Sequence, residues 1–313
     1  MANSAQHSLK YVAETQYGVT PTSPTFKELR QTGSTLALTK DALISDEQNS
    51  NRQIRSARHG ARIVGGDVSS ELFYGDLDDL LEAALGGTWQ SDTPQTGTDE
   101  LTAGTTRRSF SIQRYFGGLQ TADKPYHMAT GCEVQSMALT ISANALVTVA
   151  FTMIGQDYQP AETEPSGSIT TAATLVESFT GLFGTINENG SPIGTVTEIS
   201  LTVDNGEEAR NVVGTDLTLQ PKIGRSNVTG TLTAYFENSS LLEKFINETV
   251  TSVDFSLIDP DGNELKIELP HVKYTGGNVD ASGEDSILLA LPFQAYADPL
   301  TDNNIIIERT PIV

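Results

Sequence analysis

Hydrophobic and polar residues alternate along one stretch near residue 64. From Val64 to Tyr74 the apolar positions are separated by small or polar residues, a spacing typical of a half-buried β-strand. A turn is expected at Gly75–Asp76. From Asp79 to Leu85 the leucines and alanines recur at helical spacing, which predicts a short helix with one apolar face.

The same pattern returns in the second half of the chain. Val228 to Phe236 alternates in the same way, Gly230 stands where Gly66 stands, and Leu241 to Ile246 repeats the apolar helix face. Each predicted helix opens with a pair spaced like a capping box: Asp79 with Glu82, and Ser240 with Glu243. This number of matched positions predicts an internal duplication.

The duplication, in a chain in which Thr and Val are frequent, predicts a mainly β protein of two tandem domains, each with a short α-helix. Proline and glycine interrupt the first residues, and residues 156–195 are rich in Pro, Glu, Ser, Thr and Gly, as linkers are. The predicted parts are an N-terminal arm (1–30), a first domain (31–155), a linker (156–195), a second domain (196–298) and a C-terminal tail (299–313).

Each half is expected to end in a pair of strands, 133–142 with 145–154 and 272–279 with 286–297, the second pair joined by residues 281–284. A further hairpin is predicted around Asp259–Gly262, because Pro-Asp-Gly between alternating strands is a turn sequence. Only the first half has the insertion Gly86–Thr105, which holds the one tryptophan, Trp89. The tail contains Ile305–Ile307, a run expected to dock on the protein.

Charge and cysteine content restrict the function. The formal net charge is −21, which argues against a surface that grips nucleic acid or an anionic membrane. Cys132 is the one cysteine, so an intramolecular disulfide and a thiolate metal cluster are excluded. The sequence has neither a signal peptide nor an apolar run of membrane-spanning length. Synthesis in a cytoplasm, without a membrane anchor, is expected.

The patterns of enzyme and cofactor sites are missing from the sequence. The four histidines lie far apart, and neither a metal-ligand pair, a phosphate-binding loop nor a nucleophile elbow is found. The Asp259–Glu264 segment lacks calcium-loop spacing. We therefore expect no catalytic, cofactor or metal residues, and a protein that is not an enzyme.

A polar stretch between Asp41 and Gly60 combines acids with a basic cluster, Arg52, Arg55, Arg58 and, just beyond, Arg62. It is either a solvated loop or a basic finger that binds an acidic patch on another copy of the protein. The arm has a second distinctive run, Glu14 to Phe26. Its glycine and prolines disfavour helix and central strand, so an extended segment on its own domain or on a neighbour is expected.

The first half resembles the tail tube proteins of long-tailed, non-contractile bacteriophages. The resemblance covers residues 10–155 and lies in short motifs. They are Glu14-Thr15-x-Tyr17-Gly18-x-Thr20-Pro21, Leu29-Arg30-x-Thr32-Gly33, Arg62-x-Val64-x-Gly66-x-Val68-x-x-Glu71-Leu72 and Asp76-Leu77-Asp78-Asp79-Leu80-Leu81.

The resemblance implies a virion protein that self-assembles, with two tandem β-sandwich domains that each carry a short flanking α-helix. Strands of neighbouring subunits would join into a β-barrel around an acidic channel that conducts DNA from the capsid, and rings would stack through a long loop. Arg52, Arg55, Arg58 and Arg62 would then form the inter-ring contact, and Tyr17, Pro21 and Phe26 the inter-subunit arm. Because the chain is duplicated, three copies would make a pseudo-sixfold ring, with six full chains as the alternative. Further partners would be the tape measure, tail terminator and distal tail proteins.

Two other functions remain open from the residues. A tandem carbohydrate-binding or adhesin module would use Trp89 as an exposed aromatic. An enzyme with two dispersed carboxylates would need a deep pocket holding acids with perturbed pKa values.

Overall fold

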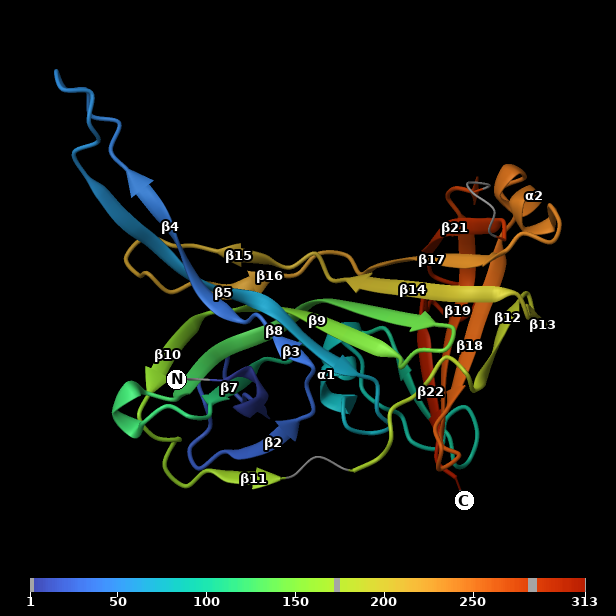
Figure 1. Ribbon diagram of the computed structural model, residues 1–313, viewed down its shortest axis with the longest axis horizontal. Helices are drawn as coiled ribbons and strands as arrows, with labels where there is room; N and C mark the ends of the chain where they lie inside the picture. Colours follow the sequence, from blue (N-terminus) through green and yellow to red (C-terminus); the bar gives the residue numbers. More distant parts are fainter. Residues whose placement is uncertain (1–2, 172–174, 281–285, 313) are drawn as a thin grey trace.

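The computed structural model describes residues 3–171, 175–280 and 286–312, and the protein is mainly β (Figure 1). The first half contributes β1 (His7–Ala13), β2 (Thr25–Leu29), β3 (Gly33–Ser34), β4 (Ala37–Ile44), β5 (Ala57–Glu71), β6 (Asp99–Thr102), β7 (Phe110–Phe116), β8 (Tyr126–Ser142), β9 (Thr148–Gly155), β10 (Asp157–Ala161) and β11 (Ile169–Thr171). The second half contributes β12 (Gly184–Glu188), β13 (Ser191–Pro192), β14 (Val196–Asp204), β15 (Glu208–Arg210), β16 (Leu219–Lys222), β17 (Asn227–Tyr235), β18 (Thr251–Ile258), β19 (Glu264–Tyr274), β20 (Asn278–Asp280), β21 (Leu288–Ala295) and β22 (Ile306–Thr310).

Within the described residues the α-helices are α1 (Asp78–Leu85) and α2 (Ser240–Ile246), and 3-10 turns lie at Ser4–Gln6 and Thr121–Asp123. Both helices follow the strands that the alternation predicted, β5 and β17. The predicted capping boxes are wrong, because the N-cap residues are Leu77 and Ser239 and neither side chain caps its helix. Asp79 instead accepts a hydrogen bond from the Tyr11 hydroxyl at 3.0 Å.

One sheet runs without a break through both halves of the chain. Its strand order is β3/β4, β5, β9, β8, β14, β17, β21 and β20, and all of these pairings are antiparallel. The two halves meet where β8 pairs with β14, as the horizontal strands of Figure 1 show. We call it the long sheet.

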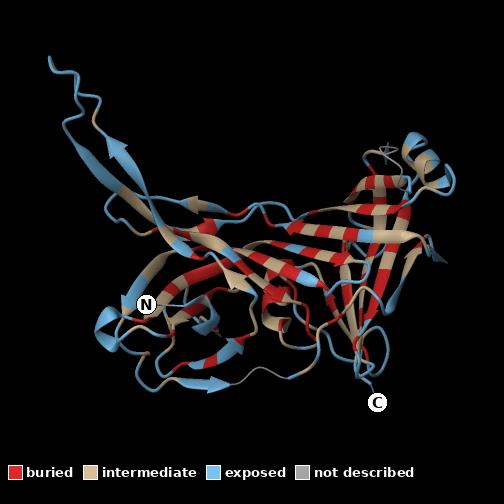
Figure 2. Ribbon diagram, viewed as in Figure 1, coloured by how far each residue is buried: buried red, intermediate tan, exposed pale blue. Residues whose placement is uncertain are grey.

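Each half closes a sandwich by adding a second layer under the long sheet. In the first half the layer has the order β11, β2, β1, β7, β8 and β10. In the second half it has the order β13, β12, β18, β19, β22 and β6. Because β8 and β19 take part in both layers, each connects its two sheets. The cores between the layers are apolar, with Phe151 and Leu201 among the fully buried side chains (Figure 2).

The segments outside the two sandwiches also join the sheets. Residues 156–195 supply β10 to β13, and Phe179 within them is fully buried. The tail docks through β22, which lies between β19 and β6 of the Gly86–Thr105 insertion. The predicted hairpin of β18 and β19 is confirmed, with Gly262 at φ +92°. The turn expected at residues 281–284 lies outside the described residues.

Candidate functional site

A long hairpin of β4 and β5 projects away from the body and ends in the loop 45–56 (Figure 1). Arg52, Arg55 and Arg58 lie on it and are exposed, and Arg55 pairs with Glu47 at 3.0 Å. We call residues 40–60 the finger. Three apolar side chains on it, Leu43, Ile44 and Ile54, are also more than half exposed. A protruding element with exposed arginines and aliphatic side chains is suited to contact with another molecule.

Arg62 lies apart from the other three arginines, at the base of the finger. Its guanidinium binds Asp157 and Asp216, each at 2.8 Å, and its backbone N–H donates to the carbonyl oxygen of Asp216 at 2.7 Å. These two carboxylates raise the pKa of Arg62. Since Asp216 belongs to the connection between β14 and β17, Arg62 fixes the finger to the second half of the same chain.

The arm motif folds around Glu14, whose carboxylate accepts four hydrogen bonds. The donors are the hydroxyls of Ser109 and Ser111, each at 2.7 Å, and the backbone N–H groups of Gly18 at 2.7 Å and Gly131 at 2.9 Å. A carboxylate with this many donors needs no further partner. Glu14 and Gly18 of the motif therefore hold the arm on its own domain.

The three arm residues differ in their exposure. Phe26 is fully buried inside its own chain, whereas Tyr17 and Pro21 are half-buried. The Tyr17 ring lies against Gly131, where an added Cβ would approach the ring to 2.9 Å. Tyr17 and Pro21 thus keep part of their surface for another contact, and Phe26 does not in the isolated chain.

The solvent-facing side of the long sheet is covered with short polar side chains. Residues opposite one another in neighbouring strands share a face, so the register defines rows across the sheet. One row is Ser69, Ala150, Ala138, Thr202, Thr229 and Gln294. The next rows are Glu71, Thr148, Thr140, Ser200 and Thr231, then Asp67, Thr152, Ser136, Asp204 and Asn227, and finally Ser142, Glu198 and Thr233. We call this surface the open face.

Acids are the charged residues of these rows, and none of the row members is Lys, Arg or His. Asp67 accepts a hydrogen bond from Thr152 at 2.8 Å and Glu198 from Ser142 at 3.0 Å. The opposite side of the same strands carries the fully buried Val64, Phe151 and Leu201. The open face is therefore polar and acidic, a combination that repels polyanions. Sequence reasoning missed it, although the alternating Thr and Ser of residues 197–204 and 227–235 were a visible signal.

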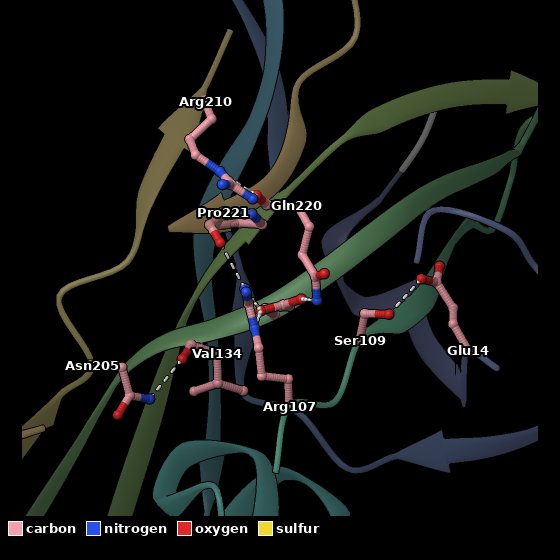
Figure 3. A network of polar contacts seen from close by, with 9 residues as sticks. Glu14, Arg107, Ser109, Val134, Asn205, Arg210, Gln220 and Pro221 are labelled. Carbon is pink, nitrogen blue, oxygen red and sulfur yellow. Dashed lines mark hydrogen bonds and ion pairs between the residues drawn. The ribbon is translucent and has the colours of Figure 1, made fainter. Parts of the chain in front are cut away.

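A buried ionic network joins the halves beside helix α1 (Figure 3). Arg107 forms an ion pair with Glu133 and donates to the Pro221 carbonyl oxygen at 2.8 Å. Gln220 donates to the other Glu133 oxygen at 2.7 Å. The Asn205 amide donates to the carbonyl oxygens of Ala84 and Val134, each at 3.0 Å. Residues of the β14–β17 connection are thereby bound to the first sandwich.

Glu207 lies in the same network with a buried oxygen that has no hydrogen-bond partner. Burial and the nearby Glu133 carboxylate raise the pKa of Glu207 to about 8. Both acids line a cavity of about 250 Å³. An enzyme would need perturbed acids of this kind, but both Glu133 oxygens are occupied by Arg107 and Gln220. The arrangement fits a junction between halves better than a catalytic pair.

Trp89 is covered by a cation. The Arg309 guanidinium lies over its ring, 4.5 Å from the centroid, and binds Asp99 at 2.9 Å and also Asp78 of α1. The Trp89 ring packs against the core and its indole nitrogen is buried. Trp89 therefore fixes the tail to the first half, and Arg309 occupies a ring face that a sugar would need.

Two kinds of feature are missing from the part of the chain that the structure describes. There, three His, Cys, Asp or Glu side chains are nowhere grouped as a metal ion requires. Within the same residues, neither helix is long and apolar enough to cross a bilayer.

Comparison with known proteins gives the family. A search of curated protein sequences finds no match to the chain. A family model described as phage tail tube protein matches residues 4–295, which include both halves and the segment between them. This match confirms the resemblance predicted from the first half and extends it to the second. The chain therefore belongs to the phage tail tube protein family, whose role is structural and whose place is the tail of the virion.

Proposed function

We propose that the protein assembles into closed rings of three chains, which stack into the hollow tail tube of a phage with a long, non-contractile tail. The observation that carries this proposal is the pairing of β8 with β14. This pairing joins two equivalent sandwiches edge to edge. Among the described strands, β3/β4 at one end of the long sheet and β20 at the other each have a free edge.

Unpaired strand edges favour association with further strands. If the same joint repeats between chains, the head of one long sheet meets the tail of the next, and a heterologous contact of this kind closes into a ring when the rotation fits. Six sandwiches then come from three chains. A ring of six full chains is the alternative.

The open face would line the channel. Its residues are short, hydroxylated or acidic, so a DNA duplex would meet like charge and few side chains that could hold its phosphates. DNA could then move through the tube without specific binding. The finger would contact the next ring through Arg52, Arg55 and Arg58, and Tyr17 and Pro21 would add contacts to a neighbouring subunit. The tape measure, tail terminator and distal tail proteins would be further partners.

The test is negative-stain electron microscopy of the concentrated protein at several salt concentrations, with class averages of end-on views. Hollow rings or tubes with threefold or pseudo-sixfold symmetry would support the proposal. Rings of six full chains would keep the tube and refute the stoichiometry. Dispersed monomers under every condition would refute self-assembly.

A further inference from the structure

We propose that neighbouring chains join by pairing β20 of one copy with β3/β4 of the next, in the register that β8 and β14 adopt within the chain. The proposal rests on the ring described above and adds the residue pairs that would form it. A second copy of this chain is the partner, because the chain already contains one example of the joint.

The internal joint covers seven residue pairs, from Glu198 opposite Ser142 to Asp204 opposite Ser136. Leu201 lies opposite Leu139, and both side chains are buried. The next pair, Thr202 opposite Ala138, lies on the open face.

The counterpart of β14 in the first half is β3/β4. Val203 lies opposite Val228, and Leu38 lies opposite Val64, the matching position of the duplication. Glu198 opposite Thr233 likewise matches Gly33 opposite Ser69. Residues 33–38 therefore correspond to residues 198–203 without a gap.

Two glycines support this correspondence independently. An added Cβ at Gly66, which has φ +138°, would lie 2.6 Å from the carbonyl oxygen of Thr35. At Gly230 it would lie 2.2 Å from the carbonyl oxygen of Ser200. Thr35 and Ser200 are matching positions, so both copies bring the same two backbones together at the same place.

The counterpart of the joining part of β8 is β20. Ala138 lies opposite Ala150 in the first half, and Asn278 lies opposite Ala290 in the second. Ala150 and Ala290 match because they face the equivalent residues Ser69 and Thr233. Asn278 and Val279 therefore correspond to Ala138 and Leu139.

Transferring the internal register to two chains places Val279 of one copy opposite Leu36 of the next, and Asn278 opposite Ala37. The backbone of Leu36 has the required direction. The Thr35 N–H donates toward β5, to Asp67 at 2.9 Å, so the adjacent residues turn their polar groups away from β5. Val279 is 36% exposed, whereas its counterpart Leu139, which β14 covers, is 3% exposed. In the proposed joint β3/β4 of the neighbouring chain would cover Val279 in the same way.

In the isolated chain Arg114 occupies this edge. Its guanidinium donates to the carbonyl oxygen of Ser34 at 3.1 Å and also to that of Leu36. A charged side chain over a strand edge discourages wrong pairing. Since a carbonyl oxygen accepts two hydrogen bonds, Arg114 can stay in contact while the neighbour's strand adds.

In the same joint, helix α2 would be contacted by a residue of the neighbouring chain. Inside the chain Asn205, which follows β14, donates to the Ala84 carbonyl oxygen of α1 at 3.0 Å. The position that matches Asn205 is Lys40, and the position that matches Ala84 is Phe245 of α2. A lysine at the C-terminal end of a helix is favourable, because that end carries partial negative charge.

The experiment is disulfide trapping with Ala37→Cys combined with Asn278→Cys. In the proposed register the two residues form a pair without mutual backbone hydrogen bonds, whose Cα atoms lie about 4.5 Å apart, within the range that a disulfide spans. Cys132 does not compete, because it is fully buried and burial raises the pKa of its thiol. Mild oxidation of assembled protein should give covalent oligomers that end at the ring size on non-reducing gels.

Two matched variants control the result. Ala138→Cys with Thr202→Cys places the same geometry inside one chain and should give an intrachain disulfide only. Thr35→Cys with Asn278→Cys shifts the register by two residues and should not cross-link. Rings by microscopy together with cross-linking of the Thr35→Cys, Asn278→Cys pair would refute the proposed register, as would rings in which neither interchain pair cross-links. Either result would leave the ring itself supported. If the protein never assembles, both the ring and the joint are refuted.

Discussion

The helices α1 and α2 occupy equivalent places in two copies of one unit, yet they differ in cover. α1 buries Leu80, Leu81, Ala84 and Leu85, whereas none of the residues of α2 is buried and Ile246 is 66% exposed. α1 lies between the halves, where Asn205 and Arg309 of the second half bind it. α2 lies at the far end of the long sheet (Figure 1). α1 packs on β8 and β6 of its own half, and the second half adds the contacts of Asn205 and Arg309. For α2 the equivalent added contacts would come from another chain.

The largest expected effect is on the stability of the two helices. Leu80→Ala should lower the free energy of unfolding by about 2–5 kcal/mol, because it leaves a cavity in a closed core. The matched Leu241→Ala should cost less, about 1 kcal/mol, because Leu241 is only partly buried before the change. Urea unfolding of dilute, unassembled protein measures both. Equal losses would show that α2 is as well packed as α1.

The network that covers α1 should make stability depend on pH. The pKa of Glu207 is raised in the folded state, so the folded protein binds a proton that the unfolded chain releases above its ordinary glutamate pKa. Stability should therefore fall as pH rises from about 5 to 8, and it should fall less in Glu207→Gln. Melting temperatures at four pH values in this range test it. The exposed neighbour serves as control, since Glu208→Gln should keep the wild-type slope.

A charge on the uncovered helix should affect assembly alone. Ile246→Asp should leave the melting temperature of the isolated chain within about 1 °C, as exposed substitutions do. It should raise the protein concentration needed for rings by about tenfold or more, the equivalent of 1.4 kcal/mol. Light scattering against concentration measures the shift. Unchanged assembly would mean that this end of α2 stays exposed in the ring.

The smallest effect is expected at the finger. Arg55→Glu combined with Arg58→Glu should weaken stacking a few-fold and leave ring closure intact, because rim charges chiefly set association rate and register. Tube length by microscopy, under salt conditions in which the wild type assembles, is the measurement. Normal tubes would contradict an inter-ring role.

Arg62→Glu should behave differently and lower the stability of the chain, since Arg62 binds Asp157 and Asp216 internally.

Local patterns in the sequence were enough to predict the repeated unit. Val64 to Tyr74 and Val228 to Phe236 alternate because one side of each strand is buried, and that information is contained in each strand itself. The helices were predicted within about a residue, but the capping boxes were predicted wrongly. In α1 the reason is that Asp79 binds Tyr11, a residue that only the tertiary fold brings near. Propensity for a cap was overridden by a distant partner.

Contacts between distant segments were beyond sequence reasoning. The arm motif around Glu14 was recognised, but its donors Ser109, Ser111 and Gly131 come from β7, β8 and the residue before β7. Glu207 could not be distinguished among 40 acids, because its burial depends on the docking of the β14–β17 connection. The four arginines looked like one cluster in the sequence, and the fold separates Arg62 from the rest.

The position of β22 has a consequence for how the protein is made. β22 is the strand partner of β6 among the described strands, and it lies more than 200 residues later in the sequence (Arg309 opposite Asp99, for example). During translation β6 therefore leaves the ribosome long before β22, and the two strands can pair only after β22 has been made. A chain without β22 would leave β6 without this partner, so the layer of the second half closes only when two segments far apart in the sequence are both present.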